Sequence, residues 1–72
     1  MTTQQKSTVI KEFLASSDCS NVSPSGENDK FFSYEEGLNE GCYMTIGENV
    51  YRCHIADETV YRNAVSLYLT MV

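Results

Sequence analysis

The chain has 72 residues, of which 10 are acidic and 5 basic, so its net charge is −5. This length permits one small domain spanning residues 1–72 and excludes a two-domain enzyme. Apolar residues make up 42%, too many for a wholly disordered chain, and the acidity argues against a phosphate-binding surface, because nucleic-acid binders normally carry excess Lys and Arg.

The first predicted element is a helix over residues 4–16. Its apolar residues Val9, Ile10, Phe13 and Leu14 recur at helical spacing, which places them on one side, while charged residues occupy the other. Such a stripe needs a core to pack against. We therefore expect this helix to cover another element of the domain.

A predicted loop over residues 18–29 follows. The segment is rich in Ser, Asn, Asp, Gly and Pro, which favour turns because of their backbone freedom, their fixed φ or their side-chain hydrogen bonds to the backbone. We expect no regular structure in it.

Two interpretations of the next segment stay open. Ser33 followed by Glu36 fits a capping box, which predicts a short helix over 33–40. Gly37 in the middle weakens that helix, since glycine loses more backbone entropy than other residues. The competing interpretation is an extended strand over 30–36.

A β-hairpin is predicted further on, with arms over 42–46 and 50–55 and a three-residue loop between them. Both arms are rich in β-branched and aromatic residues, and the loop contains Gly47. Side chains alternate between the faces of a strand. The second arm thus offers one better core face, formed by Tyr51, Cys53 and Ile55.

The last predicted element is a helix over residues 58–71. Polar residues recur at helical spacing as a narrow stripe, made up of Thr59, Asn63, Ser66 and Thr70. Asp57 can cap the start of the helix, and Glu58 and Arg62 make an i,i+4 pair. Together the elements predict an α+β fold with an N-terminal helix, one short second helix or strand, a two-stranded antiparallel hairpin and a C-terminal helix.

This C-terminal helix is apolar around most of its circumference. A helix on the surface of a monomer needs only one apolar side, so either the rest of the domain wraps it or a second chain covers part of it. We favour a homodimer, with an interface formed by Val60, Ala64, Leu67, Tyr68 and Met71.

Three cysteines are present, Cys19, Cys42 and Cys53, and an odd number cannot pair fully within one chain. The N-terminal residues form no apolar signal segment, and the uncharged stretch 63–72 is far shorter than the roughly 20 residues that cross a bilayer. These observations predict a reduced, cytoplasmic protein with buried thiols and no membrane contact.

The sequence offers no complete catalytic or metal-binding set. Cys53 and His54 are adjacent, so on a strand they point to opposite faces and cannot easily reach one zinc ion. A Cys–His nucleophilic pair would lack a third group and an oxyanion site. We therefore predict no enzyme activity, no metal and no cofactor.

Acidic residues are concentrated in the middle of the chain. Residues 12–48 contain eight acids and one base, whereas the remainder has a net charge of +2. The carboxylates either form a solubilising surface or imitate a phosphate track that blocks a basic cleft. The residues predicted to bind a partner are Glu27, Asp29, Glu35, Glu36, Glu40, Tyr43, Glu48 and Tyr51.

The functional hypothesis is thus a small acidic, non-enzymatic regulator or inhibitor that binds a protein. Its sharper form is a nucleic-acid mimic, of a kind a virus could use, that blocks a basic nucleic-acid-binding enzyme and does not itself bind nucleic acid. Two alternatives remain: an assembly subunit that docks through its apolar C-terminal helix, and a small Cys/His metal-stabilised module.

Overall fold

The computed structural model describes residues 1–24, 31–37 and 41–71, with the side chains of residues 23 and 24 set aside. Helix α1 (Thr3–Ala15) agrees with the predicted first helix to within one residue at each end. Its start is fixed by a capping box: the Thr2 hydroxyl accepts the Gln5 N–H at 3.1 Å, and the Gln5 side chain accepts the Thr2 N–H at 2.8 Å. Ile10 and Leu14 from the predicted stripe are buried.

The predicted loop over 18–29 is wrong for its first part, because strand β1 (Cys19–Pro24) occupies it. The chain turns at Asp18, which adopts a positive φ of 62°. Aspartate tolerates this left-handed conformation better than most residues. The turn-forming composition of the segment was therefore a poor guide, since pairing with a distant strand holds β1 in place. Residues 25–29 lie outside the described residues.

Strand β2 (Phe32–Glu36) replaces the predicted helix over 33–40 and supports the strand interpretation. Phe32 and Tyr34 pack against the core from alternate positions, as a strand requires. An eight-residue helix with a central glycine would gain few hydrogen bonds, whereas a strand here pairs along its whole length with its neighbour. Residues 38–40 lie outside the described part of the chain.

The predicted hairpin is present as β3 (Cys42–Ile46) and β4 (Asn49–Cys53). Its loop has two residues, one fewer than predicted, because Asn49 pairs with Ile46. Gly47 has a φ of 67°, and a positive φ at the first loop position is what a type II′ turn requires. The second arm also ends earlier than predicted, and Ile55 beyond it is 71% exposed, so it is not a core residue.

Helix α2 (Glu58–Thr70) confirms the predicted C-terminal helix. The Asp57 carboxylate accepts the N–H groups of Thr59 and Val60, and Arg62 lies 3.1 Å from the Glu58 carboxylate. The predicted polar stripe is exposed, and its members are Thr59, Asn63, Ser66 and Thr70. The stripe therefore marks the solvent side of the helix.

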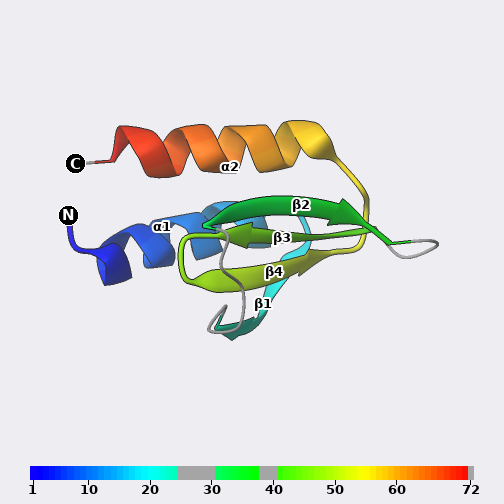
Figure 1. The fold of residues 1–72 in the computed structure, drawn as a ribbon, viewed down its shortest axis with the longest axis horizontal. Coiled ribbons are helices and arrows are strands. Elements are labelled where there is room, and N and C mark those ends of the chain that lie inside the picture. Colours follow the sequence, from blue (N-terminus) through cyan, green and yellow to red (C-terminus); the bar gives the residue numbers. More distant parts are fainter. Residues whose placement is uncertain (25–30, 38–40, 72) are drawn as a thin grey trace.

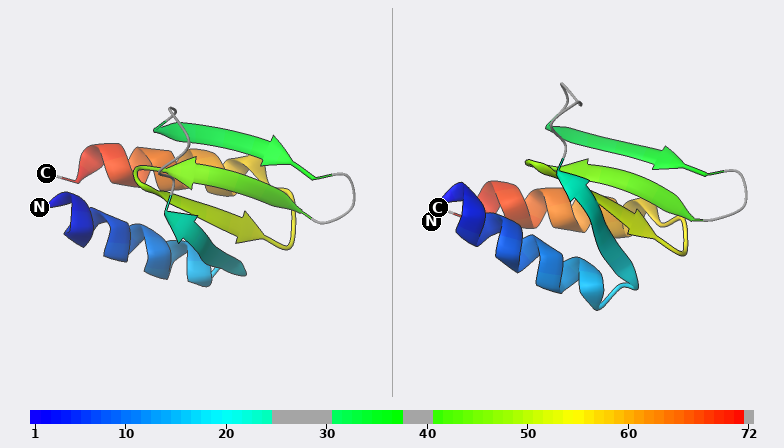
Figure 2. Two further views of the ribbon diagram at one scale, coloured as in Figure 1. Left: turned by 60° about the horizontal axis from the view of Figure 1, so that its bottom comes forward. Right: turned by 90° about the horizontal axis from the view of Figure 1, so that it is seen from below.

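The described strands form one antiparallel sheet in the order β1-β4-β3-β2, so the α+β class is confirmed but the sheet has four strands and not the predicted two. Both helices lie side by side against the same face of this sheet, and the start of α1 and the end of α2 lie at the same end of the molecule (Figures 1 and 2). We call the face toward the helices the inner face and the opposite one the outer face. None of the described helices is both long and apolar enough to cross a membrane.

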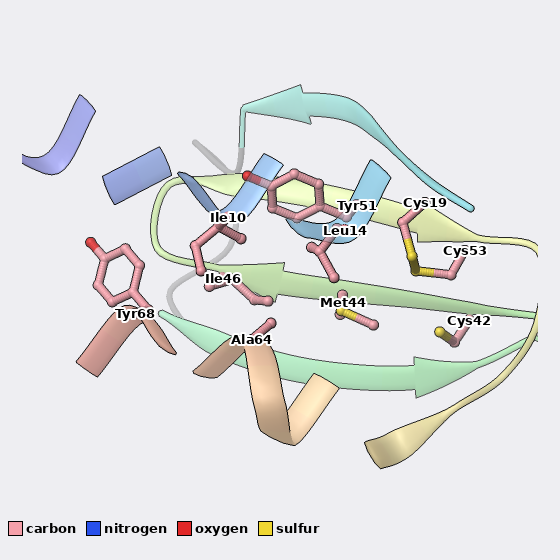
Figure 3. Close-up of a cluster of buried hydrophobic side chains, with 10 residues drawn as sticks. All are labelled: Ile10, Leu14, Cys19, Cys42, Met44, Ile46, Tyr51, Cys53, Ala64 and Tyr68. Atoms are coloured by element: carbon pink, nitrogen blue, oxygen red, sulfur yellow. A yellow bond between two sulfur atoms is a disulfide. The ribbon is translucent and has the colours of Figure 1, made fainter. Parts of the chain in front are cut away.

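The core lies between the inner face and the helices (Figure 3). It consists of Ile10, Leu14, Cys19, Cys42, Met44, Ile46, Tyr51, Cys53, Ala64 and Tyr68. Cys19 and Cys53 form a disulfide across a separation of 34 residues, which corrects the prediction of three reduced thiols. Cys42 is a buried free thiol. A pairing of such long range depends on the sheet register, which the spacing of the cysteines does not reveal.

Candidate protein-binding surface

One row of side chains crosses the outer face of the sheet. Glu35 pairs with Tyr43, Tyr43 with Arg52, and Arg52 with Ser20, each on a neighbouring strand. Directly opposed residues of antiparallel strands project to the same face. The chain neighbours of Tyr43 and Arg52 are buried on the inner face, namely Cys42, Met44, Tyr51 and Cys53. We call Glu35, Tyr43, Arg52 and Ser20 the outer row.

The outer row is accessible and chemically mixed. Tyr43 is 43% exposed, Glu35 and Ser20 are exposed, and Arg52 is half-buried with its Nη1 atom 3.5 Å from His54 Nδ1. Thr45, which follows on the same face of β3, is only 3% exposed. The accessible part of this face is therefore its end at Tyr43. It presents one aromatic ring between an acidic and a basic residue.

The other predicted partner-binding residues do not join this row. Tyr51 is buried on the inner face and is not available to a partner. Glu36 pairs with buried Cys42 and thus projects to the inner face at the sheet edge, opposite to Glu35. Glu48 lies in the β3–β4 turn, at the far end of β3. The remaining three lie outside the described residues: Glu27, Asp29 and Glu40.

This placement bears on the hypothesis of a nucleic-acid mimic. A phosphate track needs regularly spaced carboxylates on one surface. Among the described residues, Glu35, Glu36 and Glu48 lie on two faces and at two ends of the sheet. They do not form such a track, so mimicry remains a prediction without a structural argument in its favour.

Tyr34 occupies the inner face at the β2 edge. Its hydroxyl lies 3.4 Å from a Glu36 carboxylate oxygen, and its ring lies 5.3 Å from that of Tyr61 on α2. Burial, with the neighbouring Cys42 and Glu36, raises the pKa of Tyr34 to about 12. The phenol therefore remains protonated at neutral pH and can act only as a neutral hydrogen-bonding group.

Two further tyrosines are perturbed within the core. Burial raises the pKa of Tyr51, and the Asn21 and Asn49 side chains offset part of that rise. Burial also raises the pKa of Tyr68, with a smaller effect from Glu48. The Tyr68 ring makes edge-to-face contacts with the rings of Phe31 and Phe32. Both tyrosines belong to the hydrophobic core.

The residues predicted to form a dimer interface all contact the core of the domain. Ala64 and Tyr68 are buried, and the others pack against the same core, namely Val60, Leu67 and Met71. The sheet and α1 thus pack against the apolar side of α2 within a single chain. The homodimer and docking through α2 remain predictions.

The described residues contain no group of three or more His, Cys, Asp and Glu side chains arranged to hold a metal ion. Comparisons with protein-family models, with curated proteins and with solved structures find no match for this chain. The outer row is therefore the candidate site. The sequence-based prediction includes Glu35 and Tyr43 but not Arg52, which side-chain alternation along β4 places on the face opposite to Tyr51 and Cys53.

Proposed function

We propose that this chain is a non-enzymatic protein-binding regulator and that the outer row is where its partner binds. The observation that supports this most is Tyr43, an exposed aromatic residue on a sheet face that neither helix covers. Tyr and Arg are enriched in the centres of protein interfaces, because they combine a large contact area with polar ends. Tyr43 and Arg52 provide both side by side.

Charge supports the same proposal. The net charge of −5 favours encounter with a basic partner, and salt weakens such attraction. Within the outer row, Glu35 and Arg52 lie on either side of Tyr43, so a partner needs a matching pair of charges to bind in one register. The aromatic ring contributes contact area, and the charges contribute specificity.

Photocross-linking tests the proposal. A benzophenone amino acid replaces Tyr43 in one variant and Leu69, an exposed residue on the solvent side of α2, in the control. Both variants are irradiated in extract of the source cells. We expect a discrete adduct from position 43 that unlabelled chain competes away, and none of the same mass from position 69.

A charge reversal makes the test specific. Glu35→Lys should lower the yield of the adduct by about tenfold or more, because a like charge would now oppose the partner's basic group. Glu12→Lys changes the net charge equally on the exposed side of α1 and should leave the yield unchanged. Equal adducts from positions 43 and 69, or equal losses from both reversals, would contradict the proposal.

A further inference from the structure

The three cysteines lie on three neighbouring strands in a single row across the inner face. Cys53 on β4 is paired in register with Cys19 on β1 and also with Cys42 on β3. Figure 3 shows all three at the same end of the core, with the Cys42 side chain beside the disulfide. We call Cys19, Cys53 and Cys42 the cysteine row. Its middle member has a neighbouring cysteine on each side.

The spacing within the row permits two different disulfides. The His54 N–H donates to the Asp18 carbonyl at 3.4 Å, which makes Cys19 and Cys53 a non-hydrogen-bonded pair. The backbone groups of Cys53 therefore point toward β3, so Cys42 and Cys53 form a hydrogen-bonded pair with Cα atoms about 5.5 Å apart. That separation lies within the range of about 4.4–6.8 Å found for disulfides.

The third combination is excluded by distance. Cys19 and Cys42 are separated by β4, and two strand spacings amount to about 9.5 Å. Disulfides do not form across more than about 7 Å between Cα atoms without backbone movement. Cys53 is thus the common partner in both allowed bonds.

The strand order also places the three cysteines in the sequence that exchange needs. A thiolate attacks one sulfur of a disulfide from the side opposite to the sulfur that leaves. Because β3 and β1 flank β4, Cys42 approaches Cys53 from the side opposite to Cys19. This strand order is compatible with direct transfer of the disulfide from Cys19 to Cys42.

We propose that the cysteine row is a thiol–disulfide exchange site. The Cys42 thiol loses its proton, and its sulfur attacks Cys53 Sγ; the Cys42–Cys53 bond forms as the Cys19–Cys53 bond breaks. Cys19 leaves as a thiolate and takes up a proton from solvent, which balances the proton that Cys42 released to solvent. One disulfide and one thiol exist before and after, so the step needs no oxidant or reductant.

Exchange moves the free thiol from the sheet centre to its edge. Cys42 is 1% exposed on a central strand, whereas Cys19 is 7% exposed on edge strand β1. It also moves the covalent link, which then joins two central strands and leaves β1 held by its pairing with β4 and its packing against α1. The exchanged form therefore has a looser edge strand and a thiol that can form a mixed disulfide with a small thiol such as glutathione.

Three single variants test the allowed and excluded pairings. Each of Cys19→Ala, Cys42→Ala and Cys53→Ala is oxidised with glutathione disulfide, quenched in acid, and analysed by mass for free thiols and intrachain bonds. We expect an intrachain disulfide in the first two variants and none in Cys53→Ala. A folded Cys19→Ala with two free thiols, or a Cys19–Cys42 bond in Cys53→Ala, would overturn the proposal.

A second measurement uses the unmodified chain and so does not depend on how the variants fold. The protein is incubated with iodoacetamide under native conditions and digested with trypsin without reduction. Cleavage after Lys11, Lys30, Arg52 and Arg62 places each cysteine in its own peptide. We expect alkylated Cys19 together with a linked Cys42–Cys53 peptide pair. Alkylation of Cys42 alone, with Cys19 and Cys53 still linked, would refute exchange.

Discussion

Breaking the Cys19–Cys53 disulfide should remove a large part of the stability of this domain. The bond closes a loop of 34 residues, and the loop-entropy relation assigns about 3.8 kcal/mol at 25 °C to such a loop. Small domains are stable by about 0.05–0.15 kcal/mol per residue, which is roughly 4–11 kcal/mol for this length. Loss of the bond should thus lower the melting temperature by about 15–30 °C.

The measurement is urea unfolding with and without the reductant TCEP. It uses Cys42→Ala, which keeps the Cys19–Cys53 bond and prevents any replacement by a second disulfide. The control Cys19→Ala/Cys42→Ala has no possible intrachain bond and should not respond to TCEP. A loss of less than about 1 kcal/mol on reduction would refute the reasoning, because it would mean that the bond does not restrict the unfolded chain as the loop length requires.

Three further changes probe the core, one turn and one titrating group. Leu14→Ala should lower the free energy of unfolding, measured in urea, by about 2–5 kcal/mol. Leu69→Ala, at a 67% exposed position, should lower it by less than about 0.5 kcal/mol. Similar losses in the two variants would contradict the assignment of Leu14 to the core. Gly41→Ala should lower the melting temperature far more than Gly37→Ala. A Cβ at position 41 would collide with the backbone of Cys53 and His54, and Gly41 has a φ of 88°, which favours glycine. Equal shifts in melting temperature would contradict this geometry. The folded state raises the pKa of Tyr34 from 10.0 to about 12, so the free energy of unfolding should fall as pH rises through this window. Tyr34→Phe should make that fall smaller when unfolding is measured between about pH 9 and about pH 11. An unchanged slope in the variant would refute the raised pKa of Tyr34.

The two helices could be predicted from sequence because their signals are local. Helical spacing in α1 and the polar stripe of α2 lie within single segments, and the Asp57 cap directly precedes the helix it starts. The same is true of the hairpin, where strand-forming residues surround Gly47. In each case the residues that specify the element are neighbours in the chain, so no knowledge of the fold was needed.

The edge strands and the disulfide could not be predicted in this way. The composition of residues 19–24 is that of a loop, and only pairing with β4 and a bond to Cys53 make the segment a strand. β2 carried a capping signal that its pairing with β3 overrides. The outer row depends on register across four strands, which explains why Tyr43 was identified while its neighbour Arg52 was missed.

The outer row and the cysteine row lie back to back, because each cysteine is next in the chain to a member of the outer row. Exchange would therefore form a disulfide between β3 and β4, which carry Tyr43 and Arg52. It would remove the disulfide that joins β4 to β1, which carries Ser20. If both proposals hold, the partner captured through position 43 should bind Cys19→Ala and Cys42→Ala, which hold the alternative disulfides, with different affinities, measurable by titration calorimetry. Linkage requires the same partner to shift the ratio of the two disulfides in the unmodified chain by the same factor. Equal affinities for the two variants would show that the two faces of the sheet act independently.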